Sequence, residues 1–344
     1  MPAPDKQTNS SAVEKNRDGR ANRMGKAVSG VLVPLSFLLL LCITLSLTAP
    51  NFATHNNLKQ IAIQAAVVAI LACGQTAVII SGNIDLSVGA VMAFAGVMAA
   101  QAMTQGHVGV AAGVAIACAS GLGAGVVSGV ITAYGKIPSF IVTLGLMGIA
   151  RGAAGLISHA VNISGLPLGF GVFGTGELFG TADRDGLPYA VLIMLGAALL
   201  THIGLTKTTW GRGQYALGGN REAARLSGLN IRASIISVFA LSGLLAGVAA
   251  VVNVSRANVA SKDFGMGYEL DAVAAAVVGG TSLFGGQGGI PGTIIGAFLI
   301  YTIRNGCDLK DYSPDFQQMI IGAVVILAVL YDRYGPGKKA VHDK

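Results

Sequence analysis

The sequence is dominated by long apolar runs that are separated by short polar or glycine-rich breaks. A run of about 20 apolar residues is long enough to cross the hydrocarbon core of a bilayer as a helix. Hydrophobic residues make up 53% of the 344 residues and charged residues only 11%, against roughly 25% charged residues in an ordinary soluble domain. The chain is therefore expected to be an all-α, polytopic membrane protein.

Ten apolar segments can be assigned as membrane spans within a single transmembrane domain at 28–333. The expected spans are 28–48, 58–80, 91–105, 108–134, 140–157, 189–205, 233–254, 270–281, 294–305 and 316–330. An even number of crossings puts both termini on one side of the membrane. The basic segment 1–27 is expected to be a disordered cytoplasmic tail, and 334–344 a second basic cytoplasmic tail.

A basic loop at 205–232 interrupts the apolar runs in the second half of the chain. One acid, Glu222, stands against five cations, and cations are retained on the cytoplasmic side of a membrane. The loop is therefore expected to face the cytosol. The cations are Lys207, Arg212, Arg221, Arg225 and Arg232.

Within this loop the sequence predicts a short helix. Asn220 is a suitable N-cap, Glu222 falls in the first turn, and Gly228 is a suitable terminator. The helix would present a small apolar surface to another protein, although it could also be only a surface helix. Its expected apolar contact residues are Ala223, Ala224 and Leu226.

Polar residues that interrupt the apolar runs are candidates for lining a translocation path. A charge at the centre of a span costs about 2.5 to 3.5 kcal/mol, so Asp85 is expected near a boundary, in a polar cavity or paired. It could also cap the third helix with help from Ser87. Each candidate could equally serve as a helix cap or an interhelical hydrogen bond. The candidates are Asn83, Asp85, Ser87, Ser139, Thr143, Arg151, Glu269 and Asp271.

Glycines are expected to bring helices close together and to break them. Small residues let membrane helices approach closely, and Gly121, Gly123, Gly125 and Gly129 stand on neighbouring faces of the fourth span. The glycine-rich stretch 279–289 is expected to be a turn or an unwound segment, because each glycine costs a helix about 1 kcal/mol relative to alanine.

Several kinds of chemistry are excluded by motif. The chain has no G-x-x-x-x-G-K-[ST] phosphate loop, so it is not expected to hydrolyse nucleotide by that route. Its five histidines are scattered without an H-E-x-x-H pair, and its four cysteines lie in or at the end of apolar runs, which argues against a metal site. The net charge of +7 is concentrated at the N-terminus and in the basic loop, which suits anionic membrane lipid better than nucleic acid. The chain is not expected to be an enzyme.

Six motifs, in order and spacing, resemble the permease subunit of the ribose, xylose and arabinose class of ABC sugar importers. The motifs are PNF at 50–52, GNIDLSVGA at 82–90, KIPSFIVTLG at 136–145, ARG at 150–152, ALGGNREAARLSG at 216–228 and GYELDAVAAAVVGGTSLFGGQGGIPGT at 267–293. The resemblance covers about residues 30–333. Ser139 and Ser128 stand where a proline and an asparagine would be expected, and neither departure threatens the resemblance.

The resemblance implies a homodimeric importer domain of the vitamin B12-importer-like (type II) fold in the bacterial inner membrane. It also implies two partners, a cytoplasmic ABC ATPase that binds the ATP and a periplasmic or lipid-anchored sugar-binding protein, and no cofactor on this chain. The residues that match the coupling helix, which such permeases insert into a groove of the ATPase, are Asn220, Arg221, Glu222, Ala223, Ala224, Arg225 and Leu226.

The predicted function is the import of a monosaccharide, a pentose or a hexose, with energy from the partner ATPase. A branched-chain amino acid or autoinducer permease of related build is one alternative. A proton-coupled secondary carrier, in which Asp85 or Glu269 takes up a proton, is an alternative of another class. Collapse of the proton gradient would stop the carrier, whereas loss of the ATPase would stop the importer.

Overall fold

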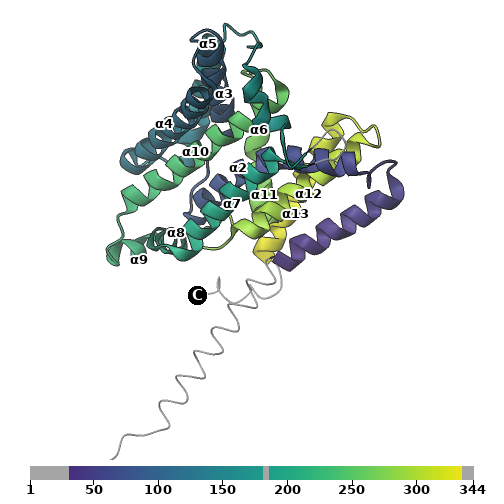
Figure 1. The fold of residues 1–344 in the computed structure, drawn as a ribbon. Helices are drawn as coiled ribbons and strands as arrows, with labels where there is room; N and C mark the ends of the chain where they lie inside the picture. The colour runs from purple at the N-terminus through teal and green to yellow at the C-terminus, as the bar shows by residue number, and fades with distance from the viewer. Residues whose placement is uncertain (1–30, 181–185, 335–344) are drawn as a thin grey trace, which may run out of the picture.

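The computed structural model describes residues 31–180 and 186–334. The expected tail 1–27, and the expected tail 334–344 except Tyr334, lie outside the described residues. The described part is almost entirely helical (Figure 1). Its elements are a first helix Val31–Thr48, α2 (His55–Ile80), α3 (Val88–Thr104), α4 (Val110–Gly135), α5 (Ser139–Ile157), η1 (Leu168–Gly171), α6 (Val172–Thr175), β1 (Glu177–Leu178), β2 (Leu187–Pro188), α7 (Tyr189–Lys207), α8 (Thr209–Gly219), α9 (Arg221–Leu226), α10 (Ile231–Ala257), α11 (Tyr268–Val278), α12 (Ile290–Asp308) and α13 (Pro314–Tyr334).

Six of the described helices are long and apolar enough to cross a membrane: the first helix, α2, α4, α5, α7 and α10. Of the remaining expected spans, α3 has 17 residues and α11 only 11. At 1.5 Å per residue α11 covers about 16 Å, roughly half of a hydrocarbon core about 30 Å thick. The helix predicted at 270–281 is too short to cross by itself, because the chain turns at Gly279 and at Gly280, whose φ is +89°. A crossing by this segment stays a prediction.

Helix α2 is the centre of the bundle (Figure 1). In its most apolar window, 94% of the residues are buried. It packs against α7, α10, α11 and α12, which surround it. Its sequence is rich in alanine, valine and isoleucine on every side, and a helix that is apolar all round is suited to a fully buried position.

Helices α4 and α10 cross at a glycine interface. A Cβ atom on Gly121 or Gly125 would run into the backbone of α10 at Gly243 or Phe239. The expected close contact is confirmed there, and also at Gly129. It is wrong for Gly123, which has open space where its Cβ would stand.

The loop before α7 contains the only pair of β-strands among the described residues. Strands β1 and β2 form a two-residue antiparallel pair, with Glu177 opposite Pro188 and Leu178 opposite Leu187. The Glu177 carboxylate accepts a hydrogen bond of 2.6 Å from the Gly186 N–H and pairs with Lys59 at the start of α2. The hairpin is thus fastened to the central helix.

Candidate functional site

The basic loop between α7 and α10 contains the predicted short helix. In α9, the Asn220 side chain accepts a hydrogen bond of 2.9 Å from the Ala223 N–H, and Gly228 ends the turn with a φ of +83°. Arg225 donates to Glu222 over 3.2 Å on the exposed face. This hydrogen bond and the positive charge of Arg225 hold the pKa of Glu222 below its usual range. The N-cap, the acidic first turn and the terminating glycine are all confirmed.

The apolar surface of α9 differs from the prediction at one residue. Leu226 is 76% exposed and Ala223 is exposed as well, but Ala224 is buried at 4%. The Ala224 carbonyl accepts a hydrogen bond from the Leu229 N–H, so this side of the helix faces the chain that follows it. Ala224 lines the groove beside α9 and offers a partner little surface, whereas Ala223 and Leu226 are exposed.

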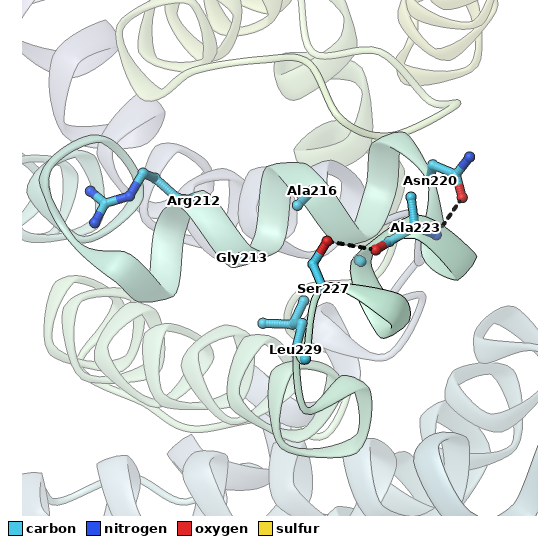
Figure 2. Close-up of a pocket in the computed structure, with 9 residues that line it drawn as sticks. Arg212, Gly213, Ala216, Asn220, Ala223, Ser227 and Leu229 are labelled. Carbon is cyan, nitrogen blue, oxygen red and sulfur yellow. Dashed lines mark hydrogen bonds between the residues drawn. The ribbon is translucent and has the colours of Figure 1, made fainter.

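A second helix, α8, precedes α9 and was not expected from the sequence. Its N-cap Thr208 accepts a hydrogen bond of 3.1 Å from the Gly211 N–H. Thr208, ahead of TWGRGQ, is a recognisable capping residue. The two glycines in this segment nevertheless argue against a helix, because glycine is unfavourable in a helix interior. Between α8 and α9 lies a groove of about 570 Å³. Figure 2 shows its lining, which includes Arg212, Ala216, Ala223 and Leu229.

Helix α8 packs against two places where the helices are interrupted, the end of α2 and the glycine-rich segment 279–289. Gly218 approaches the Ile80 carbonyl so closely that it leaves no room for a Cβ atom. The same carbonyl accepts a hydrogen bond of 2.8 Å from the Gly286 N–H. On the neighbouring face, the Tyr215 hydroxyl donates to the Gly288 carbonyl over 2.9 Å. The loop is therefore joined to the end of α2 and to the glycine-rich segment 279–289, which is unwound as predicted.

Five of the eight path candidates gather at the break between α2 and α3. The Ser139 hydroxyl accepts from the Ile84 N–H at 3.1 Å and the Thr143 hydroxyl from the Leu86 N–H at 3.0 Å. Asp85 accepts from both the N–H and the hydroxyl of Ser87, at 2.9 and 2.6 Å. Asn83 donates to the Ser81 hydroxyl over 2.9 Å.

Two partners at this break were missed by sequence reasoning. The Ser242 hydroxyl on α10 donates to Asp85 over 2.9 Å. With its oxygen and nitrogen assigned so that both find partners, the Gln75 amide spans the backbone of Asp85, donating to its carbonyl at 3.1 Å and accepting from its N–H at 3.3 Å. Side chains thus satisfy each N–H from residue 84 to residue 87, as an unwound segment inside a membrane requires. Asp85 and Ser87 are bonded to each other just before α3, but Ser87 is the N-cap of this helix and no side chain caps it. The prediction that Asp85 caps the third helix is therefore wrong, and the role of Asp85 in a path stays a prediction.

The other three candidates lie apart from this break. Arg151 donates to the Lys262 carbonyl over 2.8 Å and so ties α5 to the segment before α11. Asp271 is 2% exposed and forms an ion pair of 2.8 Å with Arg304 of α12, a partner that the sequence did not reveal. Glu269 accepts a hydrogen bond of 3.3 Å from the Gly267 N–H, and its other carboxylate oxygen has no hydrogen-bond partner.

Within residues 31–180 and 186–334, no group of three or more His, Cys, Asp or Glu side chains is arranged to hold a metal ion. The arrangement offers instead a protruding helix, a groove beside it and a rigid connection from both to the bundle. Such an arrangement can transmit force from a partner to the membrane helices.

Comparison with known proteins decides the family. Residues 57–329 match the family described as "Branched-chain amino acid transport system / permease component". The chain belongs to this permease family. The predicted membership in a class of ABC importer permeases is confirmed.

Relatives of this permease with similar sequences include permeases for ribose and L-arabinose. It is 43% identical over 300 residues to the ribose import permease protein RbsC of Escherichia coli K12, which covers 86% of this chain and 91% of the relative. It is 36% identical over 302 residues to RbsC of Bacillus subtilis, covering 88% and 92%. It is 35% identical over 308 residues to the L-arabinose transport system permease protein AraH of E. coli K12, covering 89% and 90%.

Proposed function

We propose that this permease carries a monosaccharide inward across the bacterial inner membrane, driven by a partner that hydrolyses ATP. The ribose and arabinose permeases match this chain over nearly its whole length. This match favours a pentose or a related sugar as the transported molecule. The description of the matched family mentions branched-chain amino acids, but the ribose, allose and arabinose permeases among the relatives do not favour that substrate class. ATP is bound by the partner, and this chain needs no cofactor.

The observation that carries the proposal is the attachment of α9. A capped six-residue helix lies beside a groove, and α8 contacts the end of α2 through Gly218 and the segment 279–289 through Gly218 and Tyr215. A cytoplasmic ABC ATPase that grips Ala223 and Leu226 could tilt α7 and α10 together, a two-state motion biased from outside the membrane. The residues assigned to this coupling helix are Asn220, Arg221, Glu222, Ala223, Ala224, Arg225 and Leu226, with Ala224 serving to seat the helix.

The proposal includes a ten-crossing, type II topology for the domain 28–333, between two cytoplasmic tails and with the cytoplasmic coupling loop at 205–232. The shorter helices α3 and α11 would cross together with the unwound segments that precede them. Support comes from the cations of the basic loop, which favour a cytosolic position. A homodimer and a periplasmic or lipid-anchored sugar-binding protein complete the proposed assembly.

Within this proposal the path candidates divide into two groups. The break at 83–87 is bonded to α5 through the hydroxyls of Ser139 and Thr143, and sugar hydroxyls or water can exchange with such bonds when α5 moves. The second group is assigned to fixing the positions of the helices relative to one another, through contacts around α5, α11 and α12. Its members are Arg151, Glu269 and Asp271. Weak, replaceable contacts suit a path, since tight binding would prevent release.

The test is uptake into vesicles that contain this permease, the ATPase and the binding protein. Labelled ribose, arabinose, allose and leucine are offered with ATP, without ATP, and with a proton ionophore. We expect ATP-dependent sugar uptake that the ionophore leaves intact. ATP-independent uptake abolished by the ionophore would instead establish a secondary carrier, and uptake of leucine alone would establish the amino acid class.

The coupling role is tested by the double substitution Glu222→Lys and Ala223→Asp. It reverses the charge in the first turn of α9 and places a charge on its apolar surface. ATPase binding and transport should be lost while membrane insertion is unchanged. Undiminished uptake would contradict the role of α9.

A further inference from the structure

A groove separates α7 from α10, the two helices that flank the coupling loop. Both helices pack on α2, yet they scarcely touch each other. The groove has a volume of about 570 Å³. Its wall includes Gly196, Leu200 and Gly204 from α7, and Leu241 and Val248 from α10. Leu200 is 72% exposed, so the groove opens at the surface of the helical bundle.

The lining presents almost entirely hydrocarbon to an occupant, because the polar side chains in it are already bonded within the protein. The Thr201 hydroxyl donates to the Ala197 carbonyl over 2.8 Å. The Trp210 indole N–H donates to the Ser237 hydroxyl over 2.7 Å, and that hydroxyl donates to the Ser234 carbonyl over 2.8 Å. A buried water needs two to four polar partners. Water is therefore a poor occupant, and a hydrocarbon chain is a good one.

The length of the groove matches one leaflet of a bilayer. Its walls run from Ile193 to Gly204 on α7 and from Ser237 to Val248 on α10. At 1.5 Å per residue each wall is about 16 Å long, close to half of the roughly 30 Å hydrocarbon core. Trp210 lies at the end next to the coupling loop, and tryptophan is enriched at the level of the lipid headgroups.

A cation continues the groove toward the coupling loop. Leu200 and Gly204 are four residues apart on α7, and the same helical face continues three residues later at Lys207, which is exposed in the last turn. Lys207 thus follows the apolar wall by about one helical turn, close to Trp210, and its long, exposed side chain is able to reach a phosphate at the end of the groove. A cation at the headgroup level attracts anionic lipid.

We propose that this groove binds one acyl chain of an anionic phospholipid, with its phosphate at Lys207. The assignment to the cytoplasmic leaflet rests on the proposed function, which puts the coupling loop in the cytosol. The bound chain fills the space between the two helices that carry this loop. It therefore sets the spacing of α7 and α10 through which the loop acts.

The test uses Trp210, which is the one tryptophan of the chain and lines the groove. The purified permease in mild detergent is titrated with dibrominated phosphatidylglycerol, and the quenching of Trp210 fluorescence is recorded. We expect saturation near one lipid per chain. Gly196→Phe should abolish the saturable phase, because Gly196 has open space at its Cβ position and the ring fills the groove. The matched control is Gly123→Phe on α4, where the Cβ position is also open.

A charge variant tests the headgroup contact independently of the apolar wall. Lys207→Gln should weaken phosphatidylglycerol binding about fivefold and reduce its advantage over dibrominated phosphatidylethanolamine. Lys136→Gln, which removes an exposed cation at the end of α4, should leave both affinities unchanged. Thermal unfolding of each variant in detergent shows whether it is folded.

Two outcomes overturn the proposal. The first is quenching that rises without saturation and is equal in the wild type and the folded Gly196→Phe variant, which would mean only bulk lipid contact. The second is a changed oligomeric mass in Gly196→Phe with unchanged lipid binding, which would assign the groove to a second copy of this chain. Neither measurement involves the ATPase or a sugar, so failure here is distinct from failure of the coupling role.

Discussion

The substitution Gly218→Ala tests whether α8 transmits force from the coupling helix to the bundle. A Cβ atom on Gly218 would stand 1.9 Å from the Ile80 carbonyl oxygen and 2.6 Å from the Gly286 nitrogen. Both obstacles are backbone atoms, so no change of rotamer relieves the clash. Since Cβ contacts below 3.0 Å essentially never occur in proteins, α8 must move by about 1 Å or more. Overpacking of this kind costs about 1 to 3 kcal/mol.

The neighbouring glycine provides a matched control, because Gly219 has open space at its Cβ position. Gly219→Ala removes the same backbone freedom and adds the same methyl group without a clash. Each 1.4 kcal/mol changes an equilibrium about tenfold. We therefore expect Gly218→Ala to lower ATP-driven sugar uptake by roughly tenfold, and Gly219→Ala to lower it by less than twofold.

The assay is sugar uptake in reconstituted vesicles with matched amounts of permease, together with co-purification of the ATPase. Thermal unfolding in detergent shows whether the Gly218→Ala variant is folded. The reasoning predicts a folded chain that still binds the ATPase through α9 but transports poorly. Equal transport by the two alanine variants would refute the rigid link through α8. Loss of ATPase binding with normal unfolding would mean that α8 seats α9 and does not transmit force.

Three further predictions concern local contacts. Asn220→Ala removes the cap of α9 and should destabilise this helix by about 1 kcal/mol, so that ATPase binding weakens, whereas Asn220→Asp keeps an acceptor and should bind normally. Arg225 lowers the pKa of Glu222 from its ordinary value of 4.5. The pair therefore stabilises α9 at a pH above 4.5, and this stabilisation is lost as the pH falls through the lowered pKa. ATPase binding measured from pH 8 to pH 6 should show no loss from this pair, and a fall in the wild type that Arg225→Met removes would contradict the assignment. Asp271→Asn leaves the charge of the half-buried Arg304 unpaired and should cost about 1 to 3 kcal/mol of unfolding free energy. Adding Arg304→Met should recover part of the loss. Equal melting of the single and double variants would count against an ion pair that contributes to stability.

The sequence by itself determined the features that depend on near neighbours and on composition. Its apolar runs made a membrane protein the only reasonable class, because so little charge cannot cover a soluble surface of this size. Asn220, Glu222 and Gly228 predicted a complete short helix, since a cap, a first-turn acid and a terminating glycine act within a few residues of one another. The cations of the same loop indicated its side of the membrane, which remains part of the proposal.

Only the tertiary structure decided the features that depend on segments far apart in the chain. Asp85 meets Ser242 across 157 positions, and Asp271 meets Arg304 on another helix. Ala224 is as small and apolar as Ala223, but packing buries the first and exposes the second. A local pattern specifies how a segment folds and which face is apolar. It does not specify which distant segment meets that face, because this choice depends on the simultaneous packing of all the helices.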